Sequence, residues 1–253
     1  MDHISQVIAH RGASAVAPEN TLAAVARAWQ EHADGLECDV RLTSDCQVVC
    51  IHDADTERVG DRKLVVEAHT YAELKQVDVG AEKGGAYAGE RIPLLSEWLM
   101  DVPVGKRLLI ELKTGEEILA PLFDVIDSAQ VDRGQVVIIV FDAEMVRALK
   151  ARRPEMAVYW LIDVQSNWLG CSKLKLNDVL KIAQELRCEG LGLRCHSGIN
   201  REMVRAILDA GLELNIWTVD DPIDARRYAS FGVTSISSNR PQEMCDALGE
   251  GSS

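Results

Sequence analysis

The sequence lacks any apolar run that approaches the roughly 18 residues of a membrane-spanning helix, and it is short of positive charge. Its 27 lysines and arginines stand against 40 aspartates and glutamates, which gives a formal net charge of −13. Nucleic acids and anionic membrane surfaces both attract basic proteins. We therefore expect no nucleic-acid partner and no stable membrane association.

Cysteines in a C-x-x-C arrangement are also missing. The seven cysteines form an odd, scattered set: Cys38, Cys46, Cys50, Cys171, Cys188, Cys195 and Cys245. Such a set is typical of free thiols in a reducing compartment. Residues 1–6 show neither the basic region nor the apolar stretch of a signal peptide. We therefore expect a cytoplasmic protein.

What the sequence does contain is the composition of a globular protein, with 47% hydrophobic and 26% charged residues among its 253. A chain of this mass buries roughly 70–75% of its unfolded surface, which is enough for a sizeable core. No internal repeat and no linker divides it. We therefore expect a single domain over residues 1–253.

Short apolar or β-branched runs alternate with amphipathic stretches. The eight predicted strands are Val7–His10, Leu36–Val40, Leu108–Leu112, Val136–Phe141, Val158–Ile162, Gly190–Leu193, Leu214–Val219 and Ser235–Ser238. Helices are predicted around them, the first at Thr21–Glu31 with Asn20 as its N-cap. Such alternation predicts parallel strands joined by crossover helices, and eight units in about 250 residues suit an α/β fold of the (β/α)8 TIM barrel type. An open, doubly wound sheet has the same alternation and is the alternative.

One segment breaks the alternation. Only residues 41–47 separate the second predicted strand from the next apolar run, which is too short for a crossover helix and suits an antiparallel hairpin. The returning arm would carry His52 back beside Asp39. Residues 54–92, rich in charge and glycine, follow this arm. We therefore expect a small insertion after the second strand, at about 54–92, and a helix at 94–100 that rejoins the barrel.

Ionisable side chains gather at the predicted carboxyl ends of the strands, where barrel active sites are built. Alternate residues of a strand share a face, so Glu37 and Asp39 point the same way, as do Glu111 and Lys113. Buried carboxylates are unfavourable unless they are paired or bound to a metal. Three that converge in one mouth predict one divalent cation with oxygen ligands, Mg²⁺ or Ca²⁺, because zinc more often recruits histidine or cysteine.

Six short motifs occur in order, each at a predicted strand end or in the loop that follows. They are His10-Arg11-Gly12, Pro18-Glu19-Asn20-Thr21, Glu37-x-Asp39-Val40, His52-Asp53, Glu111-Leu112-Lys113 and Trp217-Thr218-Val219. No single motif is specific, but the ordered set resembles the glycerophosphodiester phosphodiesterases, above all their cytoplasmic bacterial members, over nearly the whole chain. The resemblance implies a (β/α)8 barrel enzyme that hydrolyses glycerophosphodiesters to glycerol 3-phosphate and an alcohol.

The same resemblance implies a role for each site residue. These roles are metal ligation by Glu37, Asp39 and Glu111, acid–base catalysis by His10 and His52, and phosphate binding by Arg11 and Lys113. Phe141 and Trp217 could be core residues, but their places at predicted strand ends favour contact with the glycerol. The chemistry agrees, since a cation and two basic side chains can offset the charge that grows on the phosphate oxygens in the transition state. Which histidine is the acid, and whether water or the glycerol's own hydroxyl attacks first, is left open.

Two positions depart from the residues that are frequent in the family. Val140 stands where serine often precedes phenylalanine, and Asn239 stands where aspartate often precedes the final Arg-Pro. Both lie at the predicted mouth of the barrel. They bear on the fit of the substrate more than on the metal or the histidines.

Three alternatives to this function remain: two other activities and one protein without activity. Lys113 could be the Schiff-base lysine of an aldolase-type barrel, but the acidic cluster would then have no role. A lysophospholipase D-type activity on single-chain lipids would need an apolar groove, which the insertion could supply. An inactive barrel that serves as a binding module should have lost a metal ligand or a histidine, and all five positions are filled. Assembly into a homo-oligomer is left open.

Overall fold

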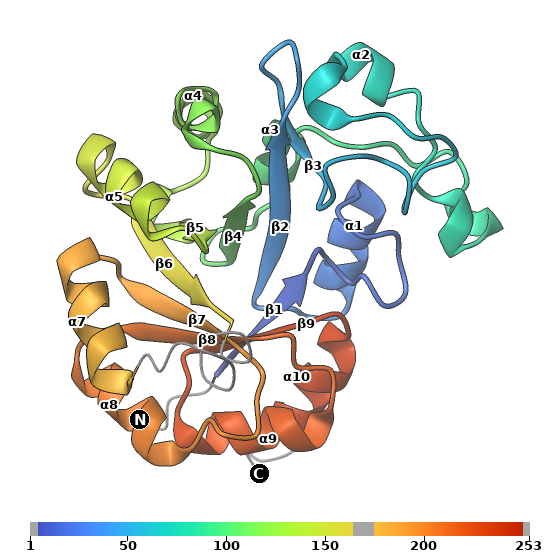
Figure 1. The fold of residues 1–253 in the computed structure, drawn as a ribbon. Coiled ribbons are helices and arrows are strands. Elements are labelled where there is room, and N and C mark those ends of the chain that lie inside the picture. Colours follow the sequence, from blue (N-terminus) through green and yellow to red (C-terminus); the bar gives the residue numbers. More distant parts are fainter. Residues whose placement is uncertain (1–4, 164–174, 250–253) are drawn as a thin grey trace.

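Figure 1 shows the computed structural model of the chain, which describes residues 5–163 and 175–249. Its parallel strands are β1 (Gln6–His10), β2 (Gly35–Leu42), β4 (Arg107–Leu112), β5 (Val136–Val140), β6 (Ala157–Ile162), β7 (Gly190–Arg194), β8 (Glu213–Trp217) and β9 (Ser235–Ser238). Strand β1 pairs with both β2 and β9, which closes the ring. The predicted (β/α)8 barrel is thus confirmed, and the open sheet is wrong.

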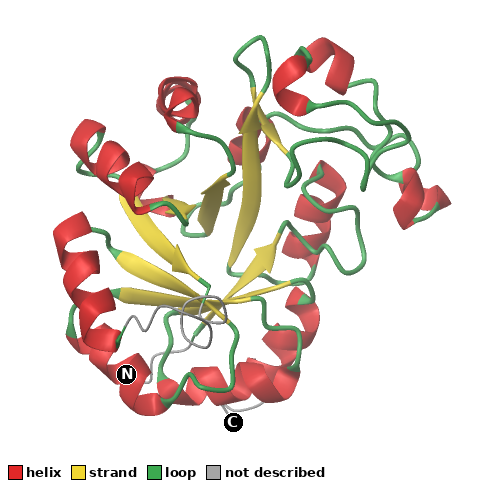
Figure 2. Ribbon diagram, viewed as in Figure 1, coloured by secondary structure: helices red, strands yellow, loops and turns green. Residues whose placement is uncertain are grey.

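Helices surround the ring of strands (Figure 2). They are α1 (Leu22–Gln30), α3 (Leu95–Met100), α4 (Leu119–Ser128), α5 (Ala143–Arg152), α7 (Leu176–Leu186), α8 (Arg201–Asp209), α9 (Pro222–Phe231) and α10 (Pro241–Gly249). Short 3₁₀ turns, η4 (Glu116–Ile118) and η5 (Arg133–Gln135), precede α4 and β5. Each helix turns an apolar stripe toward the strands, so the main core lies between the two layers.

Several element boundaries differ from the predicted ones. Strand β5 ends at Val140 and β8 ends at Trp217, so both are shorter than predicted. Helix α1 is capped by Thr21, whose hydroxyl accepts a hydrogen bond from the backbone of the first turn, and not by Asn20. The reason is conformational, because an N-cap needs extended backbone and Asn20 has a φ of 58°.

Side chains fill the interior of the barrel toward the amino ends of its strands. The inner apolar cluster consists of Ile8, Leu109, Val137, Ile139, Tyr159 and Leu161. Below it, Arg107 donates hydrogen bonds to Glu213 and to the hydroxyl of Tyr159. The barrel is therefore a packed core that is open toward the carboxyl ends of its strands.

The predicted hairpin and the segment after it are present. Strand β3 (Val48–Cys50) pairs antiparallel with β2. The chain then leaves the ring at the upper right of Figure 1 as a segment with η1 (Val66–Ala68), α2 (Tyr71–Leu74), η2 (Ala81–Lys83) and η3 (Gly85–Tyr87). Its own apolar cluster contains Val49, Ile51, Val66, Leu74, Val77, Val79 and Ile92. The insertion thus packs against the strand that leads to His52.

Among the helices that the structure describes, none combines the length and the apolar character needed to cross a bilayer.

Candidate active site

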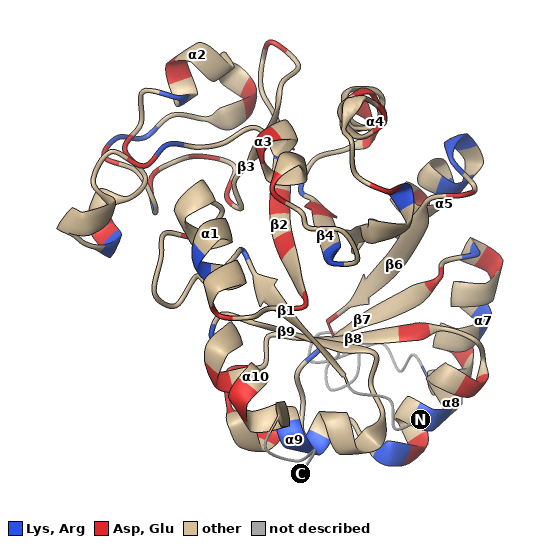
Figure 3. Cartoon of the chain, turned by 180° about the vertical axis from the view of Figure 1, so that it is seen from behind, with Lys and Arg blue, Asp and Glu red and all other residues tan. Residues whose placement is uncertain are grey.

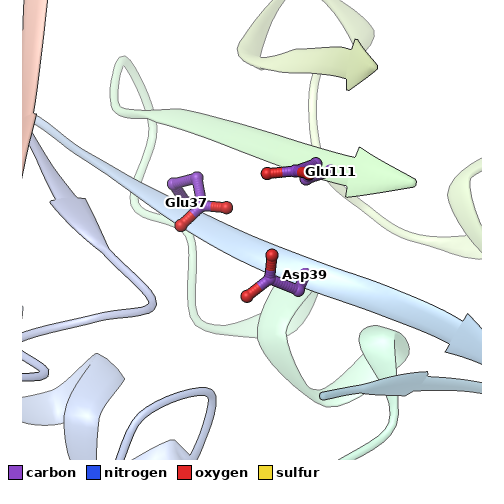
Figure 4. A group of neighbouring side chains, drawn as sticks. All are labelled: Glu37, Asp39 and Glu111. Carbon is purple, nitrogen blue, oxygen red and sulfur yellow. The ribbon is translucent and has the colours of Figure 1, made fainter. Parts of the chain in front are cut away.

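Acidic side chains from two neighbouring strands meet inside the barrel. Figure 3 shows acidic positions along β2, and Figure 4 shows Glu37 and Asp39 of β2 close to Glu111 of β4. Asp39 lies opposite Glu111 in the register of the two strands. The three residues are 2%, 0% and 8% exposed, and one oxygen of each lies within 4.8 Å of the others. Pairing of the strands thus creates a buried three-carboxylate cluster.

Burial opposes ionisation of this cluster. Burial and the nearby charge of Asp39 raise the pKa of Glu37 to about 8, and burial raises the pKa of Glu111 to about 7. Burial acts on Asp39 in the same direction, but Arg11 and Lys113 outweigh it and hold the pKa of this carboxyl below its usual value. Additional positive charge near the cluster would therefore stabilise its ionised form.

The donor set of the cluster fits a hard divalent cation. Glu37 Oε1 is buried and accepts no hydrogen bond from any residue that the structure describes. Asp39 Oδ1 and Glu111 Oε1 have the ammonium of Lys113 as their neighbour, at 3.2 Å from the aspartate and in contact with the glutamate. Buried carboxylate oxygens that accept so few hydrogen bonds are unfavourable. Carboxylate oxygens are also the ligands that Mg²⁺ and Ca²⁺ prefer.

The turn after β1 joins the first motif to this cluster. Arg11 and Gly12 both have positive φ, 57° and 76°, and a Cβ on residue 12 would lie 2.6 Å from a side chain of α1. The turn directs the backbone N–H of Arg11 to Glu37 Oε2, at 2.8 Å. It also places the Arg11 guanidinium 3.0 Å from Asp39 Oδ2. Glycine is thus needed here so that Arg11 can reach both carboxylates.

Two histidines lie beside the cluster, each with a partner at Nδ1. His10 Nδ1 is 2.8 Å from Asn239 Oδ1, and its Nε2 is 3.9 Å from Glu37 Oε2. His52 Nδ1 is 2.6 Å from Asp53 Oδ1. Burial lowers the pKa of both rings, assisted by the charge of Arg11. Both imidazoles therefore favour the neutral form, which can accept a proton, more than a free histidine does.

These groups open on a cavity of about 180 Å³ at the mouth of the barrel. Every predicted site residue lines it except Asp39, which is fully buried. The rings of Phe141 and Trp217 form one wall, edge to face, with centroids 5.6 Å apart. Asn215 and Ser237 supply polar groups to the lining. One side of the cavity is therefore charged, and the wall beside it is apolar.

Sequence reasoning missed several residues that support the site. Asn20 binds Asp39 twice, since its Nδ2 donates to Asp39 Oδ2 at 2.9 Å and its Oδ1 accepts from the Asp39 N–H at 3.1 Å. Glu19, whose role the motif alone does not define, accepts hydrogen bonds from Arg11 and from Arg58 of the insertion. Asn215 could have been found, because it shares a strand face with Trp217.

Comparison with known proteins agrees with this geometry. Residues 10–243 match the sequence model of the Glycerophosphoryl diester phosphodiesterase family. The glycerophosphodiester phosphodiesterase of Caldanaerobacter subterraneus is 32% identical over 251 residues, which cover 97% of this chain and 98% of that relative. A phosphodiesterase of Oleispira antarctica, solved in complex with the product sn-glycerol-3-phosphate, has a TM-score of 0.85 and 30% identity over 97% of both chains.

A glycerophosphodiester phosphodiesterase of Thermotoga maritima, with 23% identity, a TM-score of 0.79 and coverage of 96% of this chain and 98% of that one, shares the fold. The family match spans all six motifs noted in the sequence, from His10 to beyond Trp217. This chain therefore belongs to the glycerophosphoryl diester phosphodiesterase family of enzymes.

Proposed function

We propose that this protein hydrolyses glycerophosphodiesters to glycerol 3-phosphate and an alcohol, with one divalent cation, Mg²⁺ or Ca²⁺, at the three-carboxylate cluster. The observation that carries the proposal is the convergence of this cluster, two histidines and two basic side chains on one cavity. The relative that was solved with sn-glycerol-3-phosphate supports the glycerol phosphate end of the substrate.

Glu37, Asp39 and Glu111 are the proposed ligands of the cation. When bound, the cation supplies positive charge that stabilises the phosphate oxygens of the transition state. Arg11 and Lys113 line the same cavity and bind the phosphate. Because a phosphodiester is an anion whose equatorial oxygens gain charge as the bond to the alcohol breaks, prearranged cations favour the transition state over the ground state.

His10 and His52 are the proposed acid–base pair. Both rings line the cavity, and their lowered pKa values allow a neutral ring at physiological pH. One ring, neutral at the start, takes a proton from the attacking hydroxyl, and the other, protonated at the start, gives its proton to the departing alkoxide. The apolar wall of Phe141 and Trp217 suits the carbon atoms of the glycerol.

The structure disfavours two of the alternatives. Lys113 contacts two carboxylates, which raise its pKa, so its ammonium is a poor Schiff-base nucleophile. Two cavities between the insertion and the mouth measure about 10 Å³ and about 190 Å³. The larger of these is lined by Pro18, Val59 and Val79 and by four charged residues, Glu19, Arg58, Glu82 and Lys83. Neither cavity suits an acyl chain, so we propose water-soluble diesters as substrates, with little selectivity for the alcohol.

We further propose that residues 1–253 act as one catalytic domain, with the segment at about 54–92 as an accessory insertion. The six cysteines that the structure describes are free thiols. Free thiols are typical of reducing compartments, which supports the cytoplasm as the location. Each molecule carries a complete site on its own residues, so a homo-oligomer is not required for the chemistry.

The proposal is tested by product analysis on glycerophosphocholine, glycerophosphoethanolamine and glycerophosphoglycerol with Mg²⁺, Ca²⁺ or EDTA. We expect glycerol 3-phosphate from all three diesters, loss of turnover in EDTA and recovery with added metal. Glu37→Gln should lose metal binding and activity together, whereas Glu243→Gln, on the outer helix α10, should lose neither. Turnover that resists EDTA, or faster turnover of lysophosphatidylcholine than of glycerophosphocholine, would contradict the proposal.

A further inference from the structure

A chain of polar side chains links His10 to Asp220 across three neighbouring strand ends of the mouth. Asn239 follows β9, Asp220 follows β8, and His10 ends β1, which lies on the other side of β9. Asn239 Oδ1 lies 2.8 Å from His10 Nδ1, and Asn239 Nδ2 donates to Asp220 Oδ2 at 2.6 Å. One amide thus stands between a catalytic ring and a carboxylate.

Asp220 determines the orientation of the Asn239 side-chain amide. Its Oδ1 accepts hydrogen bonds from the backbone N–H of Asn239, at 2.8 Å, and from the Ser238 hydroxyl, at 2.9 Å. A carboxylate can only accept hydrogen bonds. If the amide were reversed, its carbonyl oxygen would face Asp220 Oδ2 across 2.6 Å with no proton between them. The NH₂ group must therefore face Asp220, and the carbonyl oxygen must face His10.

The amide in turn determines which nitrogen of His10 carries the proton. An amide oxygen can only accept, so the ring nitrogen 2.8 Å from it has to be an N–H. A neutral imidazole has one N–H, and Nε2 is then the nitrogen with a free lone pair. This nitrogen lies on the side of Glu37, 3.9 Å from its Oε2, among the residues that line the cavity.

We propose that Asn239, oriented by Asp220, is a positioning residue that holds neutral His10 in the tautomer with its proton on Nδ1. Nε2 is thereby the atom that exchanges a proton with the attacking hydroxyl or the departing alkoxide. In each turnover Nε2 accepts one proton and releases one, while the Nδ1 proton stays on the ring and remains bound to the amide oxygen. The consequence for catalysis rests on the proposed function, but the tautomer itself does not.

Ser14 provides a matched control for this chain. Its hydroxyl lies 2.8 Å from Asn239 Oδ1 and 2.7 Å from the backbone oxygen of His10, and it has one proton to give. Ser14→Ala removes a second neighbour of the same amide oxygen but leaves the link from Asp220 to His10 intact. Asn239→Leu removes the link with a side chain of similar size.

The tautomer is read by NMR on metal-free protein labelled with ¹⁵N-histidine, at a pH where the imidazoles are neutral. The His10 signals are assigned by their absence in His10→Gln. We expect a protonated Nδ1 and a bare Nε2 in the wild type and in Ser14→Ala. Asn239→Leu should lose this preference. A proton on Nε2 in the wild type, or an unchanged pattern in Asn239→Leu, would overturn the proposal.

Kinetics on glycerophosphocholine then separate positioning from a purely structural role. Asn239→Leu should lower kcat by about 10–100-fold, as is typical for partners that orient active-site groups, with KM nearly unchanged. Asp220→Asn should lower kcat less, and Ser14→Ala should leave it close to the wild type. If Asn239→Leu lowered the melting temperature but left kcat and the tautomer unchanged, Asn239 would have a structural role only. If the wild type does not hydrolyse the diester, the proposed function fails while the NMR experiment still decides the tautomer.

Discussion

At the scale of single residues, Asn20 and Asp39 show how a side chain outside the proposed metal ligands can orient one of them. Asn20 engages both a carboxylate oxygen and the backbone N–H of Asp39, from a φ of 58°. Asparagine tolerates this left-handed conformation better than most residues. The pair of hydrogen bonds leaves the carboxylate one orientation toward Glu37 and Glu111.

We expect Asn20→Ala to weaken the binding of Mg²⁺ or Ca²⁺ by about 10–100-fold, because Asp39 would lose the donor that orients it. Isothermal titration calorimetry on metal-stripped protein measures this. Thr21→Ala is the matched control, since it removes the cap of α1 and should lower the free energy of unfolding by about 1 kcal/mol without changing metal affinity. Equal affinity in the wild type and Asn20→Ala would show that Asp39 does not depend on Asn20.

Some of these residue-scale features could be predicted and others could not. Glu37, Asp39 and Glu111 were predicted to converge because residues two apart in a strand share a face and neighbouring strands end at the same edge. Asn20 was misassigned because a polar residue before a helix has the pattern of a cap whether its side chain binds that helix or a distant carboxylate. Only tertiary structure distinguishes the two.

At the scale of elements, the insertion is tied to the active site by Arg58. Its guanidinium donates to both oxygens of Glu19, at 2.8 and 2.7 Å, and to Asp53 Oδ2, at 2.5 Å. Asp53 is the partner of His52, and Glu19 is a partner of Arg11. The insertion thereby supports His52, a proposed catalytic residue, together with Arg11, a proposed phosphate-binding residue.

Arg58→Met should lower kcat by about 10–100-fold, because Asp53 and Glu19 would lose the donor that orients them. Arg58→Lys should not restore activity, since an ammonium lacks the planar fork that spans two carboxylates. The control is Arg62→Met, in the same insertion, whose partners are Asp61 and a backbone carbonyl. Steady-state kinetics with melting temperatures would contradict this view if Arg58→Met and Arg62→Met behaved alike.

The hairpin of β2 and β3 could be predicted because residues 41–47 are too few to cross the sheet as a helix. The internal structure of the insertion could not. Its cluster draws Val66, Leu74 and Val79 from a charged segment without helical or strand periodicity, and joins them to β3. Contacts of this kind leave no local pattern in the sequence.

At the scale of the whole molecule, the acidic cluster couples folding to pH when metal is absent. The folded protein holds the pKa of Glu37 at about 8 and that of Glu111 at about 7, above the values of an unfolded chain. Between the unfolded and folded pKa values the folded state therefore binds more protons than the unfolded state. The free energy of unfolding of the metal-free protein must then fall as pH rises through this window.

We expect a bound cation to offset this trend, because it would replace the protons that the cluster otherwise retains. Affinity should rise about tenfold per pH unit for each proton displaced, so the difference in melting temperature between Mg²⁺-loaded and EDTA-treated protein should widen from about pH 6 to about pH 8. Differential scanning fluorimetry across this range measures both curves. Glu37→Gln, which has no proton to lose at that position, should show a shallower pH dependence without metal. A gap that narrows with pH, or a Glu37→Gln curve parallel to the wild type, would mean that the cluster is ionised without the cation and that Arg11 and Lys113 alone are sufficient to balance its charge.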